Sequence, residues 1–272
     1  MTGASRGIGK AIALQLAGAG FDVALTARTV AEGDALEHSS TVRRSDTRPL
    51  PGSLASTSEL VEQQGVRSMV VAADLLDRAS VETAAATVLE RWGPVDVLVN
   101  NGRYVGPGHM DLFEDTPLTL LDRHLEANVM APLALSKALL PAMLERGSGT
   151  IVNITSGAGY ADPPAAAGSG GWGLGYAISK GALHRVAGVL ALELGARGIR
   201  VYNVQPGFIA TERMVQDMAE FGFDASSGAP PAVVGAVVAW LVTDPTAAEP
   251  NGRNIEAQDV CRELKLLPGW PA

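Results

Sequence analysis

The sequence predicts an α/β fold built on a doubly wound parallel sheet with helices on both faces. Short apolar segments rich in Val and Ile alternate with longer amphipathic segments, a pattern typical of parallel strands covered on both sides. A glycine-rich turn also stands before the first amphipathic segment, as in sheets of the Rossmann type. With 272 residues, 47% of them hydrophobic, the chain is expected to form a single domain, 1–272.

Each element follows from its local pattern. Strands are expected at the short apolar runs, which are residues 21–27, 66–73, 95–99, 150–155 and 199–204. Helices are expected at the amphipathic segments, which are residues 10–19, 78–92, 117–146 and 175–197. Residues 28–58 are rich in Ser, Thr, Arg and Pro, and this composition predicts a long surface insertion.

The glycine turn opens at residue 2, so the strand that should lead into it is missing from the sequence. In a doubly wound sheet that first strand is central. We therefore expect a sheet that lacks its first strand, and the intact pattern downstream favours a natural start upstream of Met1 over a defective sheet.

Composition restricts the function. The net charge of −8 argues against a nucleic-acid-binding surface, which needs a basic patch. The single Cys261 allows no intrachain disulfide, and four scattered histidines offer no metal-ligand spacing. The longest apolar run, residues 232–242, is too short to cross a bilayer, and no signal peptide opens the chain. We expect a cytoplasmic protein with neither a membrane nor a nucleic-acid partner.

Tyr176 and Lys180 form the most informative pair. Residues four apart on a helix share one face. A phenol with an ordinary pKa of about 10 transfers protons poorly at pH 7, and a neighbouring ammonium group favours its ionised form. The spacing is weak evidence alone, but together with the glycine turn it indicates a proton-transfer site.

The turn itself, Thr2-Gly-Ala-Ser-Arg-Gly-Ile-Gly9, precedes a predicted helix that carries Ile12 and Leu16 on one face. Glycines let the backbone approach a pyrophosphate, and the free N–H groups of a helix N-terminus bind it. The spacing G-x-x-x-G-x-G differs from the commoner G-x-G-x-x-G.

The ordered motifs resemble those of the short-chain dehydrogenase/reductase family, and the match runs from Thr2 to about Ala257. The resemblance rests on the glycine turn and on motifs that follow it in a fixed order. They are Asp74 after the family's third strand (here residues 66–73), the pair Asn100-Asn101, Asn128 in a helix, Ser156, the Tyr176-x-x-x-Lys180 motif and Pro206-Gly207. It implies an oxidoreductase that reduces a small ketone or aldehyde to an alcohol, or the reverse. It also leads us to expect a homodimer or homotetramer.

The resemblance implies a role for each residue. Tyr176 would be the general acid/base, and Lys180 would hold the nicotinamide ribose and lower the phenol pKa. Ser156 would orient the substrate oxygen, and Asn128 would fix a water in the proton path. Cofactor contacts are expected from Gly3, Ser5, Arg6, Gly7, Ile8, Gly9, Arg28, Asp74, Asn100, Asn101, Tyr176, Lys180, Pro206, Gly207 and Thr211.

Charge favours NADP(H) as the cofactor, with NAD(H) possible. NAD-specific relatives carry an acid at the end of the family's second strand. In this chain that strand is the segment 21–27, because the first strand is missing, and it ends in Ala27 followed by Arg28. The guanidinium groups of Arg28 and Arg6 suit a 2′-phosphate in charge and geometry.

The chain departs from the family pattern at Arg103, where glycine is usual. Residues 104–113, 157–172 and 208–223 are expected to line a broadly apolar substrate pocket. An alternative function is an NAD(P)-binding protein with little or no turnover, which Arg103 and the missing strand would favour. The complete Ser, Tyr, Lys and Asn set favours the enzyme, because a binding protein needs no proton-transfer groups.

Overall fold

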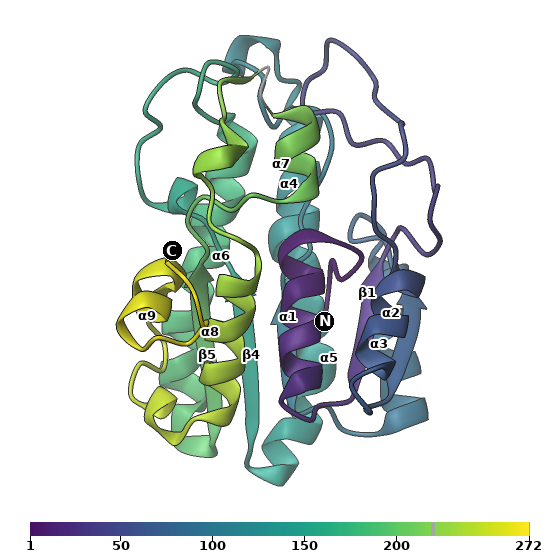
Figure 1. Ribbon diagram of the computed structural model, residues 1–272, viewed down its shortest axis with the longest axis vertical. Coiled ribbons are helices and arrows are strands. Elements are labelled where there is room, and N and C mark those ends of the chain that lie inside the picture. Colours follow the sequence, from purple (N-terminus) through teal and green to yellow (C-terminus); the bar gives the residue numbers. More distant parts are fainter. Residues whose placement is uncertain (219–220, 272) are drawn as a thin grey trace.

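The computed structural model describes residues 1–218 and 221–271, and it shows parallel strands between two layers of helices (Figure 1). One sheet pairs β1 (Val23–Ala27) with β2 (Ser68–Ala72). The other contains, in order, β3 (Val97–Asn100), β4 (Gly149–Ile154), β5 (Ile199–Gln205) and β6 (Asn254–Glu256). The five predicted strands are confirmed. The sixth was not predicted, because three residues are too few to give a pattern.

Met1 and Thr2 lie between the two sheets. The Thr2 amide donates to the Val99 carbonyl at 3.0 Å, and the Thr26 amide donates to the Met1 carbonyl at 2.9 Å. A groove of about 370 Å³ continues along the facing edges of β1 and β3. This is the place of the central strand in a doubly wound sheet, so the predicted gap in the sheet takes the form of a groove.

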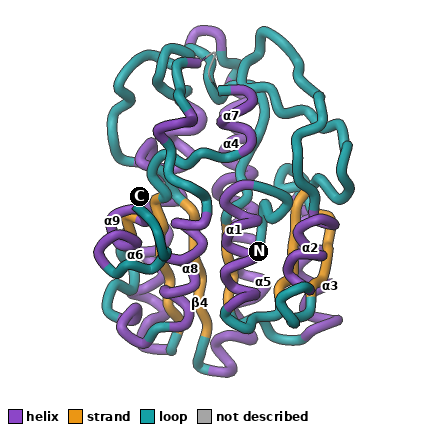
Figure 2. Tube along the Cα trace, viewed as in Figure 1, coloured by secondary structure: helices purple, strands orange, loops and turns teal. Residues whose placement is uncertain are grey.

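Helices cover both faces of the strands (Figures 1 and 2). On one face lie α1 (Gly7–Gly18), α2 (Leu54–Glu62), α8 (Ala232–Thr243) and α9 (Ala257–Glu263). On the other lie α3 (Arg78–Trp92), α5 (Ala131–Arg146) and α6 (Leu174–Leu194). The buried side chains of Ile12, Val152 and Val237 belong to the larger core, between the sheet and the pair α1 and α8.

The helix predicted at 117–146 is continuous but changes its hydrogen bonding midway. It consists of α4 (Leu118–Leu125), the π-helical turn η2 (Glu126–Met130) and α5. By length and composition alone, Leu118–Arg146 could cross a membrane. Half of its most apolar window is buried inside the protein, and α5 packs on α3 and β4, as expected of a core helix.

The predicted surface insertion is wrong in two respects. Its last residues belong to α2, which begins at Leu54 with Ser53 as its N-cap. The partner of this cap is Ser56 and not the Glu or Gln of the usual capping signature, so the sequence signal was weak. The loop is also partly internal, because His38, Ser39 and Ser40 are buried.

Candidate active site

A cleft of about 280 Å³ opens at the carboxyl ends of the strands. Parallel strands end at the same edge of a sheet, and ligands of doubly wound folds bind there. The residues that end or follow β1 to β5 all line the cleft, and they are Ala27, Ala73, Asn101, Thr155 and Pro206.

The glycine turn forms one side of this cleft. Gly3 and Gly7 have φ values of +65° and +54°, which favour glycine. A Cβ at Gly9 would lie 2.0 Å from the Gly3 carbonyl oxygen, so the turn packs its backbone directly on α1. The Gly7 amide donates to the Glu212 carboxylate at 3.0 Å. An anionic oxygen therefore already lies at the N-terminus of α1, and the site fits a phosphate group there.

The two asparagines after β3 have different positions. The side-chain nitrogen Nδ2 of Asn101 donates to the carbonyls of Thr2 and Gly3 at 3.0 and 3.1 Å and so fixes the turn. The Asn100 side chain instead donates to Asn153 Oδ1 at 3.0 Å, inside the sheet. Asn100 does not line the cleft, because successive side chains of a strand point to opposite faces. In this structure the Asn100 side chain therefore links two strands, and its cofactor contact stays a prediction.

Arg6 and Arg28 both line the cleft beside the end of β1. The Arg6 guanidinium donates to the Pro51 and Gly52 carbonyls at 2.8 and 2.6 Å, so it ties the glycine turn to the insertion. Arg28 Nη2 lies 3.5 Å from the Glu37 carbonyl oxygen. Both predicted phosphate ligands thus contact backbone carbonyls, and the contacts of Arg6 are shorter than that of Arg28.

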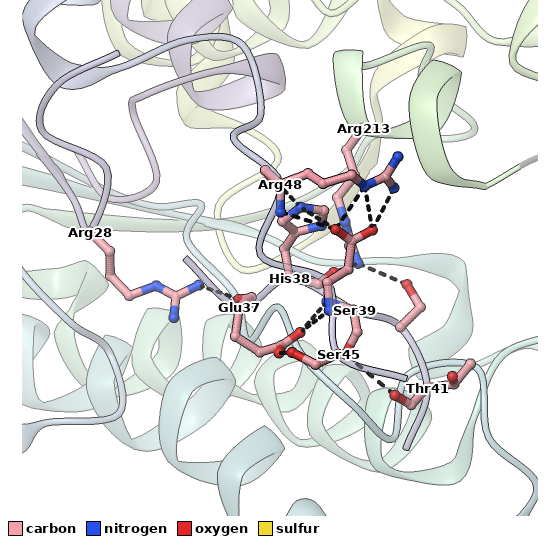
Figure 3. Close-up of polar contacts among 10 residues, drawn as sticks. Arg28, Glu37, His38, Ser39, Thr41, Ser45, Arg48 and Arg213 are labelled. Carbon is pink, nitrogen blue, oxygen red and sulfur yellow. Dashed lines mark hydrogen bonds and ion pairs between the residues drawn. The ribbon is translucent and has the colours of Figure 1, made fainter. Parts of the chain in front are cut away.

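The insertion is fastened by a polar network that Figure 3 shows. Glu37 accepts hydrogen bonds from the Ser39 and Asp46 amides, at 2.8 and 3.1 Å, and from the Ser45 hydroxyl. Burial raises the pKa of Glu37, but these hydrogen bonds outweigh it and lower the pKa to about 2. The carboxylate therefore stays ionised and holds the loop closed on itself at neutral pH.

The same loop is anchored across the cleft to α7 (Glu212–Asp217). Arg213 donates to the His38 carbonyl and the Ser40 hydroxyl, both at 2.8 Å (Figure 3). Sequence reasoning missed this wall of the cleft, although the charged residues between 37 and 48 were a signal for it. Its members at the cleft are Asp34, Leu36, His38, Arg48 and Leu50.

Tyr176 and Lys180 lie one helical turn apart on α6, and both line the cleft. Lys180 Nζ is 6.0 Å from the centre of the Tyr176 ring and donates to the Ile154 carbonyl at 2.7 Å. Lys180 is only 3% exposed. Burial, and then the Arg103 charge, lower the pKa of Lys180 to about 7. Lys180 can therefore gain or lose a proton near neutral pH, where proton transfer is efficient.

Asn128 lies behind this pair, in the π-helical turn η2. Its Oδ1 accepts from the Tyr104 amide at 2.6 Å, and its Nδ2 donates to the Ser179 hydroxyl at 2.8 Å. That hydroxyl donates to the Tyr176 carbonyl at 3.0 Å. Asn128 therefore connects the loop after β3 to the helix that carries Tyr176, without lining the cleft.

Ser156 and Gly207 also lie outside the cleft lining. The Ser156 hydroxyl accepts a hydrogen bond from the Ala158 amide at 3.3 Å and so caps the short 3-10 helix η3 (Gly157–Gly159). The predicted contact between Ser156 and a substrate is compatible with this bond, because the hydroxyl accepts from Ala158 and can still donate its own proton. The expected pocket segment 208–223 includes residues 219 and 220, which are outside the described residues. The remaining predicted residues line the cleft, and they are Ser5, Ile8, Asp74, Pro206 and Thr211.

Comparison with known proteins agrees with this geometry. A family model described as short chain dehydrogenase matches residues 51–220. The human dehydrogenase/reductase SDR family member 7 is 32% identical over 220 residues, which are 80% of this chain and 57% of that protein. This chain thus spans little more than half of the human relative. The 3-oxoacyl-(acyl-carrier-protein) reductase of Synechocystis is 31% identical over 258 residues, covering 93% of this chain and 92% of that protein.

A solved structure gives the same result. The chain is similar, with a TM-score of 0.70 and 28% identity, to a metagenomic short-chain oxidoreductase in complex with NADP, and the match covers 94% of this chain and 93% of that one. The family model covers more than half of the chain, and the human and Synechocystis relatives are 32% and 31% identical to it. The protein is therefore a member of the short-chain dehydrogenase/reductase family.

Proposed function

We propose that the protein is an NADPH-dependent oxidoreductase that reduces a ketone or aldehyde to an alcohol, or catalyses the reverse reaction. The observation that carries the proposal is that Tyr176 and Lys180 line the same cleft as the glycine turn. A substrate in this cleft would therefore contact both the proton-transfer pair and a dinucleotide bound at the glycine turn. The bound nicotinamide would supply or accept the hydride.

The chain's own groups would handle the proton. Tyr176 would donate its phenol proton to the carbonyl oxygen and would be left as a phenolate. The Lys180 ammonium on the same helix face favours that phenolate by its charge. Asn128 would keep Tyr176 in place through Ser179. Ser156 would orient the substrate oxygen by donating its hydroxyl proton to it, while it accepts from the Ala158 amide.

The preference for NADPH rests on charge. The first strand of the structure, β1, ends at Ala27 without an acidic side chain, and Arg28 lines the cleft directly after it. A ribose 2′-phosphate is favoured by such a guanidinium and disfavoured by a carboxylate. The solved relative in complex with NADP supports the same choice. A homodimer or homotetramer in the cytoplasm remains our prediction, which light scattering and fractionation would test.

The test is an assay of ketones, aldehydes and secondary alcohols with both cofactors, on the wild type and on Tyr176→Phe. General acid/base groups contribute about a hundredfold to ten-thousandfold, so we expect turnover to fall by that factor while NADPH still binds. Tyr160→Phe is the matched control, because the Tyr160 hydroxyl bonds Glu256 at 2.7 Å and Tyr160 is not among the residues that line the cleft. A Tyr176→Phe variant that keeps more than about a third of the wild-type rate would contradict the assignment.

A further inference from the structure

Arg103 places a half-buried cation beside Tyr176. Its guanidinium carbon lies 5.7 Å from the centre of the Tyr176 ring, and the residue lines the cleft. Its Nη1 atom donates two hydrogen bonds, one to the Tyr104 carbonyl at 2.9 Å and one to His109 Nδ1 at 3.2 Å. Within residues 1–218 and 221–271, no carboxylate lies within ion-pair distance of this guanidinium.

The free edge of the guanidinium has the shape of a carboxylate site. Nε and Nη2 make no hydrogen bond to the residues that the structure describes. In arginine these two atoms form a planar fork that binds both oxygens of a carboxylate. The two bonds of Nη1 on the opposite side hold this edge in position, so the fork is already oriented.

His109 supports this arrangement. Arginine only donates hydrogen bonds, so His109 Nδ1 must accept and the ring proton must lie on Nε2. The ring lies against Tyr176, with centroids 4.5 Å apart. Burial, and then the charge of Arg103, hold the pKa of His109 well below its usual value, so the ring stays neutral. His109 therefore orients Arg103 without adding a competing positive charge.

The electrostatics call for an anion. Burial lowers the pKa of Arg103, but an arginine keeps its charge in proteins. A buried charge is stable only when it is paired or well hydrogen-bonded. Arg103 is therefore the permanently charged group next to Tyr176, and a bound carboxylate would offset the cost of partly burying it.

We propose that the Nε and Nη2 edge of Arg103 binds the carboxylate of the substrate, which makes the substrate an oxo acid, or in reverse the hydroxy acid. Arg103 lies against the same Tyr176 ring that carries the proton-transferring hydroxyl. A substrate whose carbonyl oxygen meets this hydroxyl therefore reaches Arg103 with a carboxylate that is one or two carbons from the carbonyl. This is the spacing of a 2-oxo or 3-oxo acid. The inference rests on the proposed function, since the reacting carbonyl must lie at Tyr176.

The test compares acids with their uncharged esters. Pyruvate and acetoacetate are assayed against methyl pyruvate and methyl acetoacetate with NADPH. We expect wild-type kcat/KM to favour the acids, and Arg103→Gln to lose roughly ten- to hundredfold on the acids with little change on the esters. Arg103→Lys should recover part of the loss, and Arg197→Gln, at an exposed arginine, should change nothing. If Arg103 only supported Tyr176, its replacement would lower kcat/KM equally for the acids and for the esters.

A binding measurement keeps this inference separate from the proposed function. Oxamate, an unreactive carboxylate, should raise the melting temperature of the wild type with NADP⁺ present, while uncharged oxamide should not. The oxamate shift should be lost in Arg103→Gln. Esters preferred over acids by the wild type, an unchanged acid-to-ester ratio in Arg103→Gln, or equal oxamate shifts in both proteins would overturn the inference. If no carbonyl compound is turned over, the proposed function fails, and the oxamate result still decides the role of Arg103.

Discussion

Replacement of Gly9 by Ala tests whether the glycine turn is built as the structure shows. Gly9 lies inside α1, where an alanine would normally stabilise the helix by about 0.5–1 kcal/mol. Here its Cβ would lie 2.0 Å from the Gly3 carbonyl oxygen and 2.7 Å from Asn101 Nδ2. The first of these neighbours is backbone, so no side-chain rotation can relieve the contact. The turn and α1 must move apart instead.

The size of the effect follows from these opposing contributions. Overpacking of a closely packed site costs about 1–3 kcal/mol, and a 2.0 Å contact belongs at the upper end of that range. After the helix gain is subtracted, we expect a loss of about 2 kcal/mol in the free energy of unfolding. For a protein of this size that is a fall in melting temperature of roughly 4–8 °C. Displacement of Gly3 should also weaken NADPH binding.

Gly188→Ala is the matched control, because Gly188 is exposed on α6 and its nearest neighbour would be the Gly252 carbonyl oxygen at 3.8 Å. Only the helix gain remains there, so the melting temperature should rise by about 1–3 °C. Thermal melts and a fluorescence titration with NADPH measure both variants. A Gly9→Ala protein that is as stable as the wild type and binds NADPH equally well would refute the close packing of turn and helix.

Three further predictions concern charges in the cleft. Arg28→Ala should lower the kcat/KM ratio of NADPH to NADH by roughly tenfold, because a charge-assisted bond to the 2′-phosphate is lost, and an unchanged ratio would exclude that role. Glu212→Ala should tighten NADPH binding a few fold in a fluorescence titration, because its carboxylate lies at the helix N-terminus where a phosphate would bind, and weaker binding would contradict this. The pKa of Lys180 falls from 10.5 in the unfolded chain to about 7 in the folded protein. Between these pH values Lys180 is protonated in the unfolded chain but not in the folded protein, so the free energy of unfolding rises with pH. Urea unfolding at pH 7 and 10 should show this gain in the wild type and not in Lys180→Met, and equal gains would count against the low pKa.

The local patterns of the sequence were sufficient for the elements and for the common position of Tyr176 and Lys180. Apolar runs buried on both faces and a 3.6-residue period are properties of neighbouring residues, so the five strands and the helices 78–92 and 117–146 could be placed without the fold. Tyr176 and Lys180 followed for the same reason, since four residues along one helix fix their common face. The order of the motifs then indicated the family.

Only the tertiary structure decided what depends on distant parts of the chain. Arg103 meets Tyr176 and His109 across the cleft, and nothing in its local sequence indicates that its fork lacks a carboxylate. The insertion became a wall of the cleft because Arg6 and Arg213 bind its backbone from segments far along the chain. The hydrogen bond that the Ser156 hydroxyl accepts from the Ala158 amide likewise depends on how the chain turns after β4. Secondary structure follows from the periodicity of adjacent residues, whereas the charge and hydrogen bonds of a site depend on contacts that folding alone creates.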